Sequence, residues 1–178
     1  MLSLRPFSEN DAAFLLPVYH EAFPPEERME DGLMLSLAKA GSLLHLLIEE
    51  DGAPVGFFTL SGKECAYLYY FAIRKDCRGR GFGGAALALL FARFAPLPVA
   101  VDLERLDEHA PNADQRRRRR AFYLKSGFEE RGLFVKYLGM DLEILTHGEG
   151  ATLDAIRSSL LSSRVPLLEP VFTAEGAE

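Results

Sequence analysis

The sequence predicts one domain of the α/β class, in which helices cover both faces of a central mixed sheet. Three observations favour this fold. The expected elements follow the order strand, two helices, three strands, helix, strand, helix and strand. The Asp51-Gly52 dipeptide is a strong signal for an antiparallel hairpin. The strand expected over residues 65–73 carries aromatic and apolar side chains on both faces, as a buried central strand does.

Length and composition limit the class of protein. The 178 residues, 48% hydrophobic and 26% charged, can form one substantial core but are short for two. The net charge of −6 argues against a nucleic-acid binder, because phosphate binding needs clustered positive charge. No stretch of the sequence predicts a membrane span or an export signal. Cys65 and Cys77 have no metal-ligand spacing and make no disulfide framework, so we expect a cytoplasmic protein.

The first residues predict a strand and a helix. Residues 2–7 alternate in polarity, as a strand does. Residues 8–23 continue at helical spacing, and Ser8 and Asp11 are spaced as in a capping box, with Asp in place of the usual Glu or Gln. Pro17 is expected to kink or divide this helix, because proline cannot donate its backbone hydrogen bond.

A second helix and a hairpin are expected next. The helix is predicted over residues 24–41, because two glutamates follow its opening prolines and Gly41 can end it. Strands over residues 42–50 and 54–62 flank the Asp51-Gly52 turn. These two strands are therefore expected to be antiparallel neighbours.

After the central strand, helices and strands alternate. A helix is predicted over residues 82–95 and a short strand over residues 99–104. The next helix, over residues 113–126, is expected to stop at Gly127, and residues 128–145 supply one or two further strands.

The C-terminal residues predict an extension to the main domain. We expect the domain over residues 1–145 and the extension over residues 146–178. The extension contains a weak helical pattern over residues 151–162. Its last residues, 174–178, are expected to be mobile, as chain ends commonly are.

A loop rich in glycine, RKDCRGRGFGG over residues 74–84, follows the central strand. Glycines let the backbone approach a ligand closely, and the first turn of the following helix offers unpaired N–H groups and the positive end of its dipole. The loop therefore predicts a site for an anion such as a diphosphate. A plain connection is the less favoured interpretation, because a turn seldom needs so many glycines and arginines.

The loop also fits the dinucleotide-binding pattern through Gly79, Gly81 and Gly84, with Asp102 and Glu104 about twenty residues further on. In that pattern the strand runs directly into the first glycine, whereas the segment RKDCR intervenes here. The pattern also belongs to a parallel β-α-β unit, whereas an antiparallel hairpin precedes this strand. An NAD(P)-binding oxidoreductase is therefore the least favoured alternative.

Three segments resemble the GNAT family of N-acetyltransferases. Arg78-x-x-Gly81-x-Gly83 is similar to the acetyl-CoA-binding signature of the family, and FYLKSGF, residues 122–128, to its late helix-to-strand segment. Residues 4–23 look like its first strand and helix, and the matches together span residues 2 to about 140. The resemblance implies the acyl-CoA N-acyltransferase fold, with a twisted, mostly antiparallel sheet whose central strand pair splays apart.

The resemblance implies acetyl-CoA as co-substrate and no metal. In the family, the pyrophosphate lies on the backbone amides of the loop. The end of the preceding strand bulges, and its backbone holds the pantetheine arm and the acetyl carbonyl. Carried over to this sequence, the cofactor-binding residues are Phe71, Ala72, Ile73, Arg78, Gly79, Arg80, Gly81, Phe82, Gly83 and Gly84.

The resemblance also implies two catalytic roles. A tyrosine of the late helix commonly protonates the departing thiolate, and it matches Tyr123, which would otherwise be interpreted as a core aromatic. The attacking amine must lose a proton, and a carboxylate is often nearby. Glu104 is the first candidate, because it ends the strand expected beside the splayed one, and Glu64 is the second. A solvated strand end is the alternative interpretation of each glutamate.

Other charged residues have weaker assignments. Glu26, Glu27 and Arg28 fall where the family tends to bind its acceptor, and a charged helix start is the alternative. The run Arg116–Arg120 departs from the family pattern. We expect it to form a solvated or paired helix face, because the chain around it is acidic. His45, within LLHLLI, is expected to be structural.

These features predict an N-acetyltransferase that moves an acetyl group from acetyl-CoA to a primary amine by direct attack in a ternary complex. The expected acceptor is a small-molecule or peptide amine, with no nucleic-acid or membrane partner. We expect a monomer or a homodimer. The main alternative is a non-catalytic member of the family that senses acyl-CoA or binds a partner.

Overall fold

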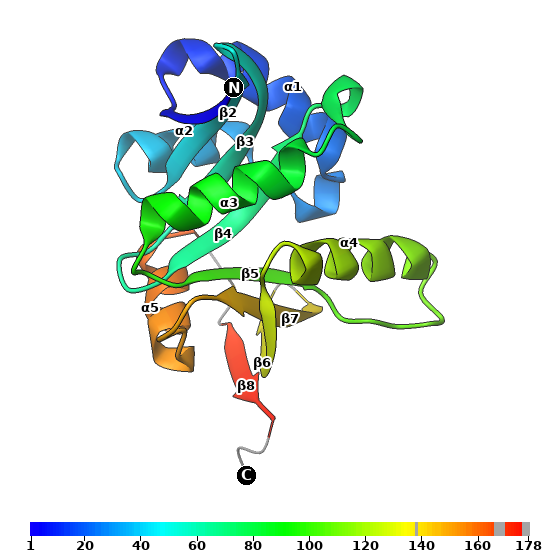
Figure 1. Cartoon of the computed structure of the whole chain (residues 1–178). Coiled ribbons are helices and arrows are strands. Elements are labelled where there is room, and N and C mark those ends of the chain that lie inside the picture. The colour runs from blue at the N-terminus through cyan, green and yellow to red at the C-terminus, as the bar shows by residue number, and fades with distance from the viewer. Residues whose placement is uncertain (138, 166–169, 176–178) are drawn as a thin grey trace.

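An eight-stranded sheet forms the centre of the structure, with strands in the order β1-β2-β3-β4-β5-β7-β6-β8 (Figure 1). The computed structural model describes residues 1–137, 139–165 and 170–175. The strands are β1 (Leu2–Pro6), β2 (Leu44–Glu50), β3 (Ala53–Ser61), β4 (Ala66–Ile73), β5 (Val99–Glu104), β6 (Glu129–Tyr137), β7 (Met140–His147) and β8 (Val171–Ala174). The helices are α1 (Ala12–Ala22), α2 (Asp31–Lys39), α3 (Phe82–Phe94), α4 (Ala113–Lys125) and α5 (Leu153–Ser162), with 3-10 turns at Glu9–Asp11, Pro25–Glu27 and Lys75–Cys77.

The sheet opens at its centre. Every neighbouring strand pair is antiparallel except β4 and β5, which are parallel. Their ladder holds only three residue pairs, the last between Leu68 and Val101. Beyond that pair β4 continues to Ile73 and β5 to Glu104, so the two strands diverge. The predicted mixed, mostly antiparallel sheet with a splayed central pair is confirmed.

One extra residue in β4 forms a β-bulge where the ladder ends. Leu68 pairs with Leu60 of β3 and Tyr70 pairs with Thr59, so Tyr69 has no partner of its own on β3. A bulge bends its strand and increases the local twist. It therefore helps to turn the end of β4 away from β5.

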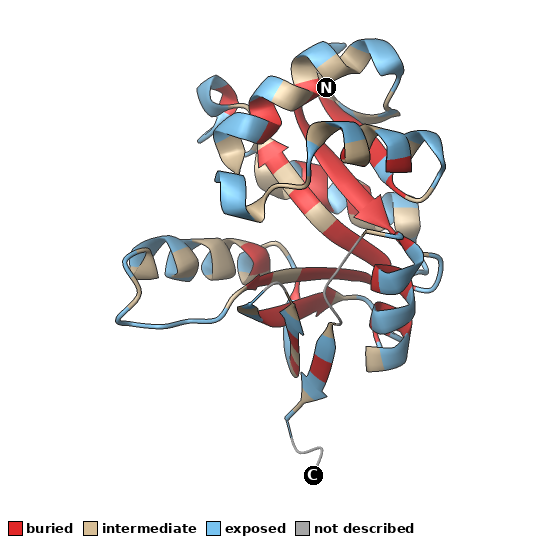
Figure 2. Ribbon diagram, turned by 180° about the vertical axis from the view of Figure 1, so that it is seen from behind, coloured by how far each residue is buried: buried red, intermediate tan, exposed pale blue. Residues whose placement is uncertain are grey.

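Helices cover both faces of the sheet, as the sequence predicts. α3 and α4 pack on one face together with Leu46 and Phe58. α1 and α2 pack on the opposite face against Leu47 and Phe57, and α5 covers the part of that face beyond β4. Figure 2 shows that the buried residues follow the strands between these helices. No described helix has the length and apolar character needed to cross a membrane.

The second helix is shorter than predicted. Residues 24–30 do not belong to it, and Pro25 begins a 3-10 turn instead. α2 starts at Asp31 because the carboxylate of Glu30 caps it, accepting the backbone N–H groups of Gly32 (3.0 Å) and Leu33 (2.7 Å). In the first helix, Pro17 does not divide α1, which runs unbroken across it.

Residues beyond 146 add to the same sheet. α5 closely matches the helix predicted over residues 151–162, and β8, which the sequence analysis did not predict, pairs antiparallel with β6. Of the end expected to be mobile, residues 176–178 lie outside the described part of the chain. The division of the chain at residue 145 stays a prediction.

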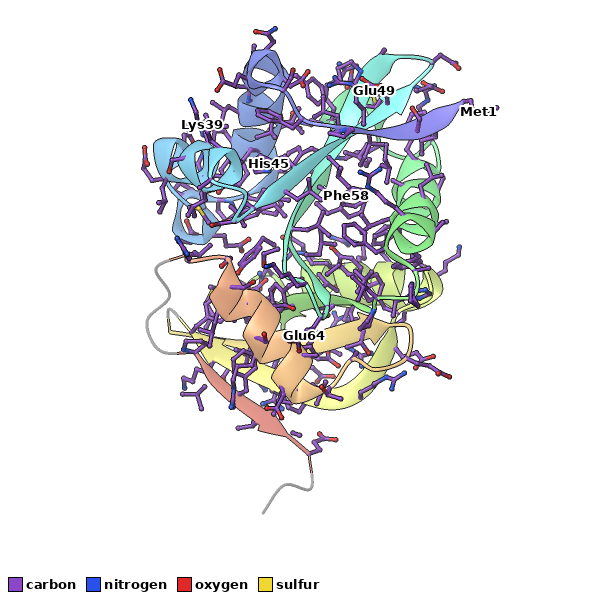
Figure 3. All side chains as sticks on the ribbon, turned by 90° about the vertical axis from the view of Figure 1, so that its left-hand side faces the viewer. Met1, Lys39, His45, Glu49, Phe58 and Glu64 are labelled. Carbon is purple, nitrogen blue, oxygen red and sulfur yellow. The ribbon has the colours of Figure 1, made fainter. Side chains whose placement is uncertain are left out.

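His45 is a structural residue of β2, as expected. It is 2% exposed and lies in the half of the molecule away from Glu64 (Figure 3). Its Nδ1 lies 2.8 Å from the hydroxyl of Thr59 on the neighbouring strand. Burial lowers the pKa of His45 to about 4, so the ring is neutral at neutral pH.

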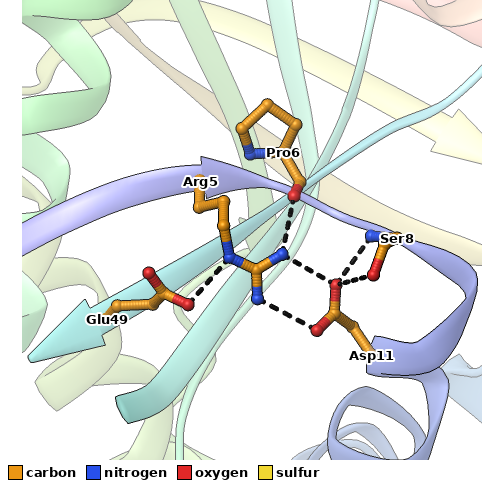
Figure 4. Close-up of polar contacts among 5 residues, drawn as sticks. All are labelled: Arg5, Pro6, Ser8, Asp11 and Glu49. Carbon is orange, nitrogen blue, oxygen red and sulfur yellow. Dashed lines mark hydrogen bonds and ion pairs between the residues drawn. The ribbon is translucent and has the colours of Figure 1, made fainter. Parts of the chain in front are cut away.

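A polar cluster joins β1 to the start of α1 (Figure 4). Arg5 donates to both carboxylate oxygens of Asp11 (2.9 and 3.0 Å) and to Glu49 of β2 (2.8 Å). Asp11 also accepts the backbone N–H of Ser8 at 2.7 Å, as the capping-box spacing predicts. The guanidinium of Arg5 holds the pKa of Asp11 well below its usual range.

We expect D11N to lower the free energy of unfolding by about 1 kcal/mol at neutral pH, because it weakens the contact with Arg5 and the cap at Ser8. Since the folded-state pKa of Asp11 is depressed, its stabilisation is complete above the ordinary carboxyl pKa of 3.8 and is lost as the pH falls further. The difference between wild type and D11N should therefore shrink below about pH 4. Urea unfolding across this range measures it. E9Q is the control, because the exposed Glu9–Lys39 pair should contribute little.

Candidate active site

A cavity of about 760 Å³ lies where β4 and β5 diverge. Its walls come from the glycine loop, β4, β5, α4 and the connection between α1 and α2. Most of the site residues predicted from the sequence line it, namely Glu26, Glu27, Arg28, Phe71, Ala72, Ile73, Arg78, Gly79, Gly81, Phe82, Gly83, Gly84, Glu104 and Tyr123. The structure therefore brings together residues that are far apart in the sequence.

Two predicted residues lie outside the cavity lining. Arg80 points to the neighbouring hairpin, where it donates to Glu50 (2.9 Å) and lies over the ring of Phe82, 4.5 Å from its centroid. Glu64 is exposed in the turn between β3 and β4 (Figure 3). Its position gives no support to a role as proton acceptor.

The glycine loop has the backbone that the sequence predicts for an anion site. Gly79 and Gly81 have φ values of 76° and 82°, and no described atom beyond their immediate chain neighbours lies within 4 Å of where a Cβ would stand on either residue. Gly81 caps α3, and the amide of Ala85 donates to its carbonyl (3.3 Å). The amides of the preceding helical residues cannot find acceptors within α3, so they are available to a ligand in the cavity.

Side chains hold the loop in place. The Nε of Arg78 donates to the carbonyl of Ile73 at 2.8 Å, which ties the loop to the end of β4. A Cβ on Gly83 would lie 3.1 Å from the ring of Phe122. Glycine at position 83 therefore lets the start of α3 approach α4 closely.

Tyr123 lies in α4 and is buried against aromatic rings. The centroids of Phe122 and Phe128 are each 5.3 Å from its own, in edge-to-face arrangements. Burial raises the pKa of Tyr123 to about 12, and the nearby charge of Arg119 partly opposes this effect. The phenol is therefore neutral at physiological pH and keeps a proton that it can donate.

Glu104 borders the cavity at the end of β5, and polar partners hold its carboxylate. Arg116 lies 2.8 Å from one oxygen and Arg119 lies 3.7 Å from the other. The side-chain amide of Asn112 donates to both oxygens, at 3.0 and 3.2 Å. These contacts fix the position of the carboxylate at the end of β5.

The run Arg116–Arg120 is largely a paired helix face, as expected. Besides the contacts of Arg116 and Arg119 with Glu104, Arg120 donates to both oxygens of Glu143 on β7, at 2.9 and 3.2 Å. Arg117 donates to Asp114 one turn earlier at 2.5 Å. The run therefore joins α4 to β5 and β7.

The segment before α2 closes the other side of the cavity. Tyr70 of β4 donates its hydroxyl to the carbonyl of Glu27 (3.1 Å), and the N–H of Met29 donates to the same hydroxyl (3.1 Å). Burial raises the pKa of the Glu27 carboxyl. These bonds place Glu26, Glu27 and Arg28 at the rim of the cavity in a 3-10 turn and the residue that follows it.

The sequence analysis did not assign several cavity residues to the acetyltransferase site, above all Asp102 of β5 and Tyr137 of β6. The hydroxyl of Tyr137 donates to the carboxylate of Asp102. The alternation of β5, which places Asp102 on the same face as Glu104, was the available signal for the aspartate. No local pattern pointed to Tyr137, because β6 reaches the cavity through its pairing with β7.

Comparisons with known proteins agree with this geometry. A search of curated proteins found no match. Among solved structures, a protein from Bacteroides thetaiotaomicron described as a GNAT-family acetyltransferase is similar, with 27% identity, a TM-score of 0.68 and coverage of 83% of this chain and 87% of that one. An acetyltransferase from Thermus thermophilus shows 24% identity and a TM-score of 0.61, with coverage of 83% and 96%.

A ribosomal-protein-alanine N-acetyltransferase from Brucella melitensis shares the fold, with 22% identity, a TM-score of 0.57 and coverage of 81% and 98%. The family model described as "Acetyltransferase (GNAT) domain" matches residues 42–130, half of the chain. That match covers the hairpin, the splayed strands, the glycine loop and Tyr123. The chain belongs to the GNAT family of acetyltransferases.

Proposed function

We propose that the protein transfers an acetyl group from acetyl-CoA to a primary amine by direct attack in a ternary complex. The observation that carries this proposal is the cavity at the splayed strands, which connects the glycine loop to the acidic segment before α2. A ternary complex needs one space that both substrates can enter. The cavity provides it.

The cofactor side of the cavity fits a CoA ester. The open backbone at Gly79 and Gly81 leaves room for a pyrophosphate against the loop amides and the positive end of α3. Phe71, Ala72 and Ile73 pair with β3 along one edge of β4, while their other edge faces the gap left by β5. The backbone groups on that free edge would pair with the pantetheine arm.

Polarisation of the acetyl carbonyl and proton donation to the thiolate complete the proposed reaction. Backbone donors at the end of β4 would stabilise the charge that develops on the acetyl oxygen as the amine attacks. The neutral phenol of Tyr123 would protonate the thiolate as the C–S bond breaks.

On the acceptor side, Glu26, Glu27 and Arg28 would bind the amine substrate. Carboxylates at the rim favour a cationic molecule, which agrees with an amine that is protonated in solution. The related fold from Brucella is named for an alanine of ribosomal proteins, so the proposed acceptors include a peptide as well as a small molecule.

We also propose a cytoplasmic location, because both cysteines are free and buried.

Titration calorimetry with acetyl-CoA tests the cofactor, with CoA, NAD and NADP as comparisons. We expect micromolar or tighter binding of acetyl-CoA and none of the dinucleotides. Release of CoA thiol in the presence of primary amines then tests transfer. Binding of NAD alone would contradict the proposal, and binding of acetyl-CoA without transfer to any amine would favour an acyl-CoA sensor.

A further inference from the structure

Asp102 lies at the point where the two central strands separate. The β4–β5 ladder ends at the pair Leu68 and Val101, so Asp102 is the first residue of β5 beyond it. The residue lines the cavity and is partly exposed, and its carboxylate accepts the hydroxyl hydrogen of Tyr137. It is therefore a carboxylate at the apex of the gap in which the proposed reaction takes place.

The core clusters show which face of the sheet Asp102 takes. Val101 and Leu103 pack in the cluster that contains α3 and Tyr123. Ala100 packs in the cluster that contains α5, on the opposite face. Because side chains alternate along a strand, Asp102 shares the face of Ala100. The proposed proton donor and the Asp102 carboxylate thus lie on opposite sides of the splay.

Direct attack needs a proton donor for the thiolate and a proton acceptor for the amine on opposite sides of the reacting carbonyl. The thiolate leaves on the side of Tyr123, while the amine approaches from the side lined by the segment before α2, where Glu27 and Tyr70 lie. A proton acceptor for the amine must be on that second side. Asp102 is there, and Tyr123 is not.

We propose that Asp102 is the catalytic residue that accepts a proton from the attacking amine, an assignment that rests on the proposed function. The ammonium form of the acceptor gives one proton to the carboxylate of Asp102, and the free amine then forms the C–N bond. The C–S bond breaks, and Tyr123 donates its proton to sulfur. The second proton that leaves nitrogen restores Tyr123 through solvent, and the proton on Asp102 passes to water. The products are an amide, CoA thiol and one proton.

Glu104, the candidate predicted from the sequence, is already engaged by other side chains. Its carboxylate contacts Arg116, Arg119 and Asn112. Asp102 takes part in none of the ion pairs found among the described residues. It can therefore take up a proton without breaking an ion pair.

The surroundings of Asp102 also favour proton uptake. Burial raises the pKa of its carboxyl, while the hydrogen bond from Tyr137 opposes that effect. A carboxylate with a raised pKa is a better base toward an ammonium group. The titratable groups around it are Tyr67, Tyr69 and Tyr70 of β4, Glu104 of β5, Tyr137 of β6, Arg119 and Tyr123 of α4, and Glu27.

The test compares D102N with E104Q in the full-length protein and uses two kinds of nucleophile. One is the fastest acceptor among methylamine, spermidine and a lysine-containing peptide, whose amines are protonated at neutral pH. The other is hydroxylamine, which is not. We expect D102N to lower kcat/KM about 10²-fold or more with the protonated amine and far less with hydroxylamine. E104Q should affect both nucleophiles alike, and both variants should keep the wild-type Kd for acetyl-CoA.

Chemical rescue separates catalysis from structure. Formate should restore part of the rate of D102A, because a small carboxylate can occupy the vacated space. Equal losses with both nucleophiles in D102N and no rescue by formate would overturn the inference, as would a selective loss in E104Q. A wild-type protein that binds acetyl-CoA but transfers to no amine would instead overturn the proposed function, and the inference with it.

Discussion

Replacement of Tyr123 by phenylalanine is expected to lower kcat about 10²-fold or more and to leave the Kd for acetyl-CoA close to that of wild type. The ring keeps its packing on Phe122 and Phe128, so only the hydroxyl is lost. Without it, the thiolate must leave without a proton or take one from water. Burst and steady-state release of CoA measure the loss in kcat, and calorimetry measures the Kd.

The pH dependence of the wild type and a control variant also test the role of Tyr123. Because the pKa of Tyr123 is about 12, its ionisation should not lower the wild-type rate below about pH 11. Y19F is the control, since Tyr19 is also buried and donates one hydrogen bond, to the carbonyl of Met29, but does not line the cavity. It should lower stability by about 1 kcal/mol and retain turnover. Unchanged kcat in Y123F would remove Tyr123 from the role of acid.

The second large effect is expected in the glycine loop. G81V should weaken acetyl-CoA binding at least tenfold, because valine strongly disfavours the φ of 82° at this position and would also place a side chain in the space left for the ligand. A loop that relaxes to negative φ would turn its amides away from the pyrophosphate. Calorimetry with acetyl-CoA measures the effect directly, with no need for a known acceptor.

G41V is the matched control for this variant. Gly41 has a φ of 73° and, like Gly81, no described atom beyond its chain neighbours within 4 Å of where a Cβ would stand, but it follows α2 and does not line the cavity. Both variants should lose a similar amount of stability, about 1–2 kcal/mol, from the backbone strain alone. Only G81V should lose affinity. Retained affinity in G81V would mean that the loop does not lie under the pyrophosphate.

Local signals in the sequence predicted the elements that depend on local conformation. Asp51 and Gly52 both have positive φ, as a tight hairpin turn requires, and β2 and β3 pair on either side of them. The glycine loop was predicted for the same reason, because its glycines indicate backbone conformations with positive φ. The start of α2 was predicted too early, because the acidic pattern after Pro25 resembles a helix start while the cap is in fact Glu30.

Features that depend on distant pairing were not predicted. β8 is a strand because Val171–Ala174 finds an edge on β6, which no pattern within the segment indicates. The contact between Tyr137 and Asp102 likewise needs the order β5-β7-β6. The sequence also showed five consecutive arginines and predicted a solvated or paired helix face, but it did not show that Arg120 would pair with Glu143 of β7.

The bulge at Tyr69 decides which face of the sheet each later residue of β4 takes. Tyr67, before the bulge, faces α5, and Tyr70 and Ala72 face the same side, whereas strict alternation from Tyr67 would send them to the α3 side. Phe71 therefore lies on the opposite face, where its ring stacks on that of Phe58 with the two ring centroids 4.5 Å apart. Loss of this one residue would exchange the two faces of the strand downstream, so the side chains that β4 contributes to each half of the cavity would change places.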